Sequence, residues 1–215
     1  MTLRLYFHPL SSFSHKVLIA LYENATPFEP EIVNFFEEPS ASAFKRLWPV
    51  GKIPVLRDEK ADRTVPESSI IIEYLDRHYP GATRFLPEDP DLARQTRMRD
   101  RFFDLYVHVP MQKIVTDKLR PEGGNDPVGV AEARAMLATT LGMIDRDLAA
   151  KSWAMGDRFT LADCAAAPAL YYINLIMPLA EHHHHAAAYL DRLVTRPSYA
   201  RALKEAEPYF KLFPG

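Results

Sequence analysis

Apolar and polar positions alternate at the start of the chain and then change to a helical spacing. Leu3, Leu5 and Phe7 follow the two-residue period of a half-buried strand, which Pro9 ends. From Ser14 onward the apolar residues recur every three or four positions, which predicts a helix. The same reasoning predicts the other elements of residues 1–80: a strand over 28–33, a helix over 40–47, a hairpin of strands 53–56 and 64–65, and a helix over 68–79.

The rest of the chain follows a helical spacing. Residues 81–90 are rich in proline and lack periodicity, which predicts a linker. One long helical pattern over 92–119 contains Pro110, where we expect a kink. Further helices are predicted over 128–150, 161–177, 189–194 and 199–206. The predicted fold is an α/β domain over 1–80, the linker, and an all-α domain over 91–215.

The composition is that of a globular chain with little net charge. The 215 residues are 47% hydrophobic and carry a net charge of -2, so the charge balance suggests neither nucleic acid nor an anionic membrane surface as a partner. We see neither a signal segment nor an apolar run that could span a bilayer. The single cysteine, Cys164, lies in an apolar helical pattern and is expected to be buried and inert. A single cysteine also fits a reducing compartment, and we expect a cytoplasmic location.

Three hydroxyls gather where the first strand gives way to the first helix. Ser11, Ser12 and Ser14 lie at the predicted helix N-terminus, with Phe13 between them. Free backbone N–H groups and the positive end of the helix dipole make such a place suitable for an anion. A serine that simply caps the helix explains the same residues. Both interpretations stay open at this point.

Two more places along the first domain suggest contact with a ligand. Pro54 stands at the start of a predicted strand, although proline cannot donate to a sheet ladder. A cis Ile53–Pro54 bond would turn the backbone of Ile53 towards an extended, peptide-like ligand; an ordinary edge-strand proline is the alternative. Glu67 and Ser68 open the next helix, where they could hold an amino group and a carboxylate, or only cap the helix.

Two patterns in the helical part predict structure rather than chemistry. Thr160 and Asp163 have the spacing of a capping box, with aspartate where glutamate or glutamine is usual. The run from His182 to His185 could suggest a metal site. Because adjacent side chains on a helix point in different directions, four in a row cannot all bind one ion. We therefore expect a solvated segment there and no metal.

In combination, these motifs resemble the cytosolic glutathione transferases over essentially the whole chain. The opening Leu-Tyr-Phe-His-Pro-Leu-Ser-Ser-Phe-Ser is similar to the serine-type classes, theta and zeta above all. Gly-Lys-Ile-Pro-Val-Leu resembles the cis-proline loop of the family, Pro-Glu-Ser-Ser its glutamate-serine helix start, and Phe-Thr-Leu-Ala-Asp its helical-domain cap. The resemblance implies a thioredoxin-like first domain, an all-helical second domain, a homodimer, and glutathione as co-substrate.

The resemblance also implies roles for individual residues. Ser11 would donate a hydrogen bond to the thiolate of glutathione, with Ser12 and Ser14 as fallbacks. Lowering a thiol pKa of about 8.5 by two units takes about 2.7 kcal/mol of preferential thiolate binding. The Ile53 backbone beside Pro54 would pair with the cysteinyl part of glutathione, Lys52 would meet its glycine carboxylate, and Glu67 with Ser68 would hold its γ-glutamyl end. Thioredoxins carry Cys-x-x-Cys at this turn, where this chain has Ser11 and Ser14, so we expect no dithiol–disulfide chemistry.

The second substrate is expected to be a hydrophobic electrophile. Its pocket should lie between the domains against the long helix, with Tyr106, His108 and Met111 as candidates; core packing explains residues at such a spacing equally well. Zeta-like enzymes carry cysteine where this chain has Phe13, which ranks maleylacetoacetate-type isomerisation below conjugation. Peroxide reduction, and a non-catalytic protein that binds glutathione and serves a stress or interaction role, are the remaining alternatives.

Overall fold

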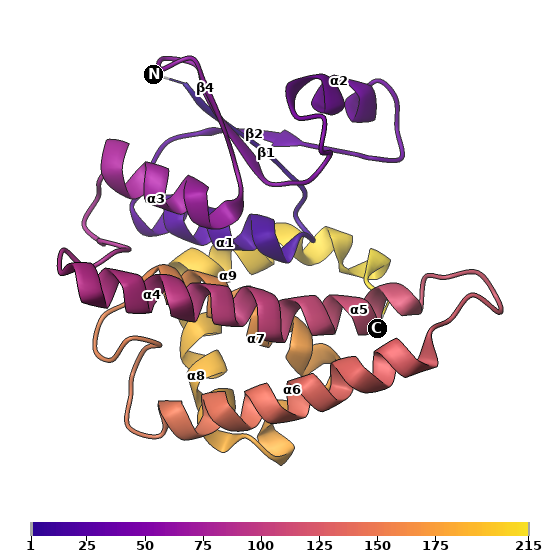
Figure 1. The fold of residues 1–215 in the computed structure, drawn as a ribbon. Coiled ribbons are helices and arrows are strands. Elements are labelled where there is room, and N and C mark those ends of the chain that lie inside the picture. The colour runs from indigo at the N-terminus through magenta and orange to yellow at the C-terminus, as the bar shows by residue number, and fades with distance from the viewer. Residues whose placement is uncertain (1, 215) are drawn as a thin grey trace. The chain divides into compact units, whose positions relative to one another are not determined.

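The computed structural model describes residues 2–214, which form two compact units (Figure 1). Among the described residues, the first unit comprises 2–86 and 197–210, and the second comprises 87–196 and 211–214. The sequence placed everything after residue 90 in one helical domain. The structure instead assigns the helix α9 (Pro197–Ala206) to the first unit, because it packs against α1 (Ser12–Glu23).

The first unit contains a four-stranded mixed sheet. Its strands are β1 (Leu3–Phe7), β2 (Glu29–Ile32), β3 (Val55–Asp58) and β4 (Arg63–Pro66), in the order β2-β1-β3-β4. β1 and β2 are parallel, whereas β1–β3 and β3–β4 are antiparallel. The predicted strands and hairpin are therefore confirmed, and every second residue of β1 is buried, as its period predicts.

The helices of this unit are α1, α2 (Ser40–Leu47), α3 (Ser68–His78) and α9. α1 and α3 pack against each other beside the sheet (Figure 1). Because α9 also covers α1, eight consecutive residues of α1, from Ser14 to Leu21, are buried. α1 is thus a core helix buried on every side, although its sequence includes the polar pair His15 and Lys16.

Side chains at the C-terminal end of α1 bind α9. Ser198 donates a hydrogen bond to Glu23 at 2.8 Å, and the Tyr22 hydroxyl donates to Glu205. The guanidinium of Arg201 lies 3.9 Å from the centre of the Tyr22 ring, a cation–π contact. A short 3-10 segment, η3 (Glu207–Leu212), follows α9.

The second unit is built from α4 (Pro90–Phe102), α5 (Val109–Asp117), α6 (Pro127–Leu148), α7 (Leu161–Ile176) and α8 (His184–Thr195). A π-helical segment, η1 (Phe103–His108), joins α4 to α5, and a 3-10 turn, η2 (Leu179–Glu181), precedes α8. The predicted helices are thus present, but the single helix expected over 92–119 is interrupted by η1.

The π-helical segment lies on the N-terminal side of Pro110. Proline has no N–H, so the carbonyl of Tyr106 lacks the donor that an α-helix would supply from position 110. The hydroxyl of Thr140 in α6 lies 3.0 Å from that carbonyl and 3.0 Å from the Met136 carbonyl of its own helix, so the Tyr106 carbonyl shares this donor. The proline is therefore accommodated by a π-helical segment and a partner from α6.

The capping box at the start of α7 is confirmed. The Thr160 N–H donates to Asp163 at 2.8 Å, the Thr160 hydroxyl donates at 2.9 Å, and the Tyr189 hydroxyl donates to the other carboxylate oxygen at 2.5 Å. Burial raises the pKa of Asp163, while these donors act in the opposite direction. The buried carboxylate thus joins α7 to α8.

The histidine run is mostly exposed to solvent, and the single cysteine is buried. His182, His184 and His185 are exposed, and Asp145 of α6 accepts the His185 N–H at 2.8 Å, which caps α8 from outside. Cys164 is a buried free thiol, as predicted. Within residues 2–214, no group of three histidine, cysteine or acidic residues could hold a metal, and no helix is long and apolar enough to cross a membrane.

Candidate functional site

The register of the sheet brings the three sequence motifs to one edge. Tyr6 of β1 pairs with Val55 of β3, and Val55 pairs in turn with Pro66 of β4. These three paired residues form one row across the sheet. At this row or one residue beyond it, β1 ends and leads to the serine turn, and β4 ends and leads to Glu67. β3 begins at the same row, directly after Ile53–Pro54. Segments that are far apart in sequence thus meet at one end of the sheet.

The serine turn is ordered by its own backbone and by Ser11. Ser11 is the N-cap of α1, with its side-chain oxygen accepting the Ser14 N–H at 3.3 Å. The Ser11 N–H donates to the His8 carbonyl at 2.9 Å, and the His8 ring nitrogen Nδ1 accepts the Leu10 N–H at 3.2 Å. Burial lowers the pKa of His8. The cap interpretation is therefore confirmed, and the Ser11 oxygen that accepts the cap bond still carries a hydrogen to donate.

The three serines differ in access. Ser11 and Ser12 are partly exposed, whereas Ser14 is fully buried and its hydroxyl has no partner among the described residues. A side chain with no exposed surface cannot reach a ligand in this conformation. Of the two fallbacks for Ser11, only Ser12 is therefore accessible.

The Ile53–Pro54 bond is cis, as the sequence predicted. Pro54 is buried beside the sheet and Ile53 is partly exposed. Across residues 2–214, neither the N–H nor the carbonyl of Ile53 has a backbone hydrogen-bond partner. The neighbouring Lys52 is exposed. The geometry leaves this stretch of main chain available for an extended ligand.

The start of α3 has an unusual backbone. Glu67, its N-cap residue, has φ 70° and ψ 118° and makes no side-chain capping bond. This combination is strained for a residue other than glycine, and such strain gathers at functional sites. Ser68 is the first helical residue and is 5% exposed. Sequence reasoning found both residues but not the backbone conformation, because glutamate gives no signal of positive φ.

A contact that the sequence did not predict joins the two helix starts. Lys16 of α1 is 1% exposed, and its ammonium donates to the Ser69 hydroxyl of α3 at 2.8 Å. The sequence feature that could have indicated this contact is a lysine within an apolar helical pattern. This buried bond fixes the first turn of α3 against α1, so both helix N-termini keep their places at the edge of the sheet.

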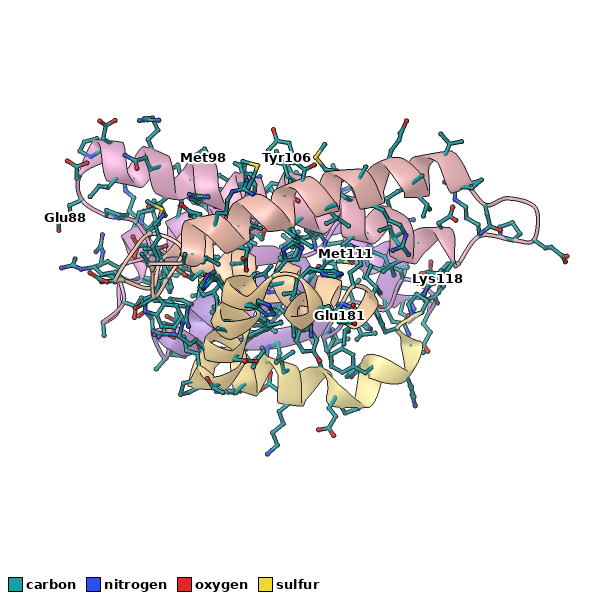
Figure 2. The ribbon with its side chains drawn as sticks, turned by 90° about the horizontal axis from the view of Figure 1, so that it is seen from below. Glu88, Met98, Tyr106, Met111, Lys118 and Glu181 are labelled. Carbon is teal, nitrogen blue, oxygen red and sulfur yellow. The ribbon has the colours of Figure 1, made fainter. Side chains whose placement is uncertain are left out.

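The three electrophile candidates separate by exposure within the helical unit. Tyr106 on η1 is 45% exposed and lies along the outer side of the unit with Met98, whereas Met111 is enclosed by other helices (Figure 2). His108 and Met111 are 4% and 3% exposed. Their burial fits core packing, and their assignment to an electrophile pocket stays a prediction. Tyr106 is the most accessible of the three candidates.

Comparison with known proteins identifies the family. Residues 5–83 match the family model of the glutathione S-transferase N-terminal domain, and residues 127–205 match that of the C-terminal domain. This chain belongs to the glutathione transferase family. The predicted fold class, a thioredoxin-like α/β domain with an all-helical domain, is thereby confirmed.

Relatives of this glutathione transferase family member match it over nearly their full lengths. Glutathione S-transferase F13 of Arabidopsis thaliana is 27% identical, with 94% of both chains covered. The stringent starvation protein A homologue of Haemophilus ducreyi is 30% identical over 91% of this chain and 87% of its own. A crystal structure of a Methylobacterium radiotolerans glutathione S-transferase, in complex with glutathione sulfonate, is 30% identical, with 94% of both chains covered and a TM-score of 0.82.

Proposed function

We propose that this protein is a serine-type glutathione transferase that holds glutathione as its thiolate for attack on a hydrophobic electrophile. The observation that carries the proposal is the row of Tyr6, Val55 and Pro66, because it gathers the serine turn, the cis-proline loop and the start of α3 at one edge. The solved relative bound to glutathione sulfonate supports glutathione as the ligand.

Ser11 is the proposed thiolate donor. Its cap bond uses an oxygen lone pair and directs the hydroxyl at the end of α1, where the helix dipole also favours negative charge. A charge-assisted hydrogen bond together with a helix terminus is of the order of the roughly 2.7 kcal/mol that a two-unit pKa shift requires. Ser11 would act as a hydrogen-bond donor and would form no covalent bond.

The rest of glutathione would extend along the same edge. The Ile53 main chain is proposed to pair with the cysteinyl residue, as an added strand pairs with a sheet edge. Lys52 is exposed and could meet the glycine carboxylate. Glu67 would bind the γ-glutamyl ammonium, and the helix start at Ser68 would bind the neighbouring carboxylate.

Tyr106 is the proposed contact for the electrophile. We rank conjugation, as in detoxification, above the isomerase alternative, because Phe13 stands where zeta-like enzymes carry cysteine; peroxide reduction stays a separate alternative. A second candidate function is a non-catalytic interaction role. It is favoured by the relative named a stringent starvation protein A homologue, which covers 91% of this chain.

Glutathione binding and turnover separate these functions. We expect the protein to be retained on immobilised glutathione, to lower the pKa of the bound thiol, and to conjugate an aromatic halide. Peroxides and maleylacetone in the same panel test the two alternatives. Retention with no reaction across the panel would favour the interaction role, and absence of binding would refute the proposal.

We also propose a cytoplasmic homodimer. Met98 with Leu105, and Met136 with Met143, are pairs seven residues apart on neighbouring helical segments, and all four are 44–51% exposed. Apolar faces of this kind mark protein contacts. Light scattering should give twice the chain mass, and Met136→Glu combined with Met143→Glu should halve it. A monomeric wild-type protein would contradict the dimer.

A further inference from the structure

His15 is the first residue of the buried polar pair in α1, and its contacts lead to the serine turn. Its ring nitrogen Nε2 lies 2.5 Å from the carbonyl oxygen of Pro9, two residues before Ser11. A carbonyl can only accept, so Nε2 carries the hydrogen and donates it. The His15 backbone N–H donates to the Ser11 carbonyl at 2.9 Å. One residue therefore bonds to the chain on both sides of Leu10.

The imidazole is itself held by the returning helix α9. The ring of Tyr199 meets the His15 ring edge to face, with centroids 5.9 Å apart and planes at 66°. His15 is 0% exposed and Tyr199 is 1% exposed. Burial lowers the pKa of His15 to about 4, although the Pro9 bond acts in the opposite direction. The ring therefore stays neutral near pH 7 and keeps a fixed donor.

We infer that His15 is a positioning residue for Ser11. It holds the serine turn through its bond to Pro9, and Tyr199 of α9 holds the His15 ring in place. The inference rests on the proposed function, because a position for the Ser11 hydroxyl matters only if that hydroxyl meets a thiolate. A hydrogen bond to a developing charge depends steeply on geometry, so a turn that is fixed in advance makes the donor more effective. His15 touches no ligand in this scheme.

The decisive measurement is the pKa of the bound glutathione thiol, which is obtained from the ultraviolet absorbance of the thiolate as a function of pH. His15→Phe keeps a ring against Tyr199 but removes the donor, and should raise that pKa by about one unit, which is tenfold less thiolate below the pKa. The kcat with an aromatic halide should fall about tenfold, while KM for glutathione changes less than about twofold. His15→Gln, whose amide can donate to Pro9, should restore most of the loss.

Ile19→Val, at a fully buried position of the same helix, is the matched control for lost stability. It should lower Tm without moving the thiol pKa. If His15→Phe does not fold, Tyr199→Leu tests the same chain of contacts and should raise the thiol pKa by a smaller amount. An unchanged thiol pKa in the folded variant would overturn the inference alone. A wild-type protein that does not lower the thiol pKa would overturn both this inference and the proposed function.

Discussion

The two helices that start at the site begin in opposite ways. Ser11, at the start of α1, has an ordinary extended backbone with φ -74° and ψ 116°. Its side-chain oxygen accepts a hydrogen bond from the Ser14 N–H. Glu67 opens α3 at φ 70° and makes no side-chain capping bond. One helix start satisfies its own backbone, whereas the other is strained and leaves its cap without a side-chain acceptor.

The difference suits two different parts of a ligand. At α1 the cap stabilises the turn and the hydroxyl hydrogen remains for a single atom, the proposed thiolate. At α3 the first helical bond runs from the Ile71 N–H to the Glu67 carbonyl, so the preceding N–H groups lie at the open end of the helix, where a carboxylate fits. The strain at Glu67 costs about 1–3 kcal/mol, which is a reason to expect a functional role there.

The largest expected effect is a loss of stability in acid, which should begin at α1. The pKa of His15 is lowered by burial from 6.5 to about 4, so the unfolded chain binds a proton in that range that the folded chain does not. The stabilisation is complete above pH 6.5 and is lost as the pH falls towards 4, by about 3 kcal/mol. Urea unfolding across this range should show the loss, and His15→Phe should remove it. Equal pH slopes in the two proteins would contradict the prediction.

The α3 side should keep its stabilisation to lower pH. Asp58 of β3 accepts the hydroxyls of Tyr79 and Tyr74, at 2.5 and 2.7 Å, at the other end of α3. Burial on its own would raise the pKa of Asp58, but these donors and backbone N–H groups lower it below 3.8 overall. Its contribution is present above pH 3.8 and is lost below it, so amide exchange should report α1 opening before α3 as the pH falls.

Ser11→Ala should have the next largest effect. Removing a donor that meets developing charge reduces kcat/KM about 100-fold. The thiol pKa of bound glutathione should rise, its Kd should stay nearly the same, and loss of the cap should lower the free energy of unfolding by about 1 kcal/mol.

Ser14→Ala is the matched control, because that buried hydroxyl has no partner to lose. It should leave both turnover and stability nearly unchanged. An unchanged thiol pKa in Ser11→Ala would move the donor role to Ser12 or to backbone N–H groups.

Ser68→Ala should show the opposite pattern. Loss of one hydrogen bond to the γ-glutamyl carboxylate should raise the Kd of glutathione about tenfold, as expected for a bond to a charged group. The thiol pKa should not move. Calorimetry and thiolate absorbance on this variant and on Ser11→Ala therefore separate binding from activation, and a shared phenotype would break the proposed division between the two helix starts.

Glu67→Gly should change stability modestly, and in the favourable direction. Glycine tolerates positive φ, so the free energy of unfolding should rise by about 1 kcal/mol while glutathione binds more weakly. Ala25→Gly is the control, since Ala25 has φ 48° at an exposed position after α1. It should gain stability and keep glutathione affinity. Equal affinity losses in both variants would show that Glu67 does not bind the ligand.

Periodicity and turn residues were enough to predict most of the fold. The strand at Leu3–Phe7 and the helix at Ser40–Leu47 have the predicted bounds, because burial alternates or recurs there as the sequence does. The cis Ile53–Pro54 bond was predicted, whereas the second cis bond, Glu38–Pro39, was not. The Ser11 cap and the accessibility of Ile53 also agree with expectation.

What the sequence missed depends on partners distant along the chain. Pro110 suggested a kink, but a hydroxyl from Thr140 in another helix allows a π-helical segment instead. His108 and Met111 have a helical spacing that core and pocket residues share, and their burial is a fact that this spacing could not predict. Helix α9 joined the first unit because of Tyr22, Glu23 and His15, contacts that no local pattern reveals.

The place of α9 has a consequence for synthesis. The first unit is discontinuous: its sheet and three helices precede the helical unit in the chain, and its last helix follows it. A nascent chain that has emerged only as far as Arg196 therefore lacks the helix that covers α1, and the His15 side of α1 is still uncovered. The helical unit can fold before the first unit is complete, so the serine turn acquires its full support only when α9 has left the ribosome.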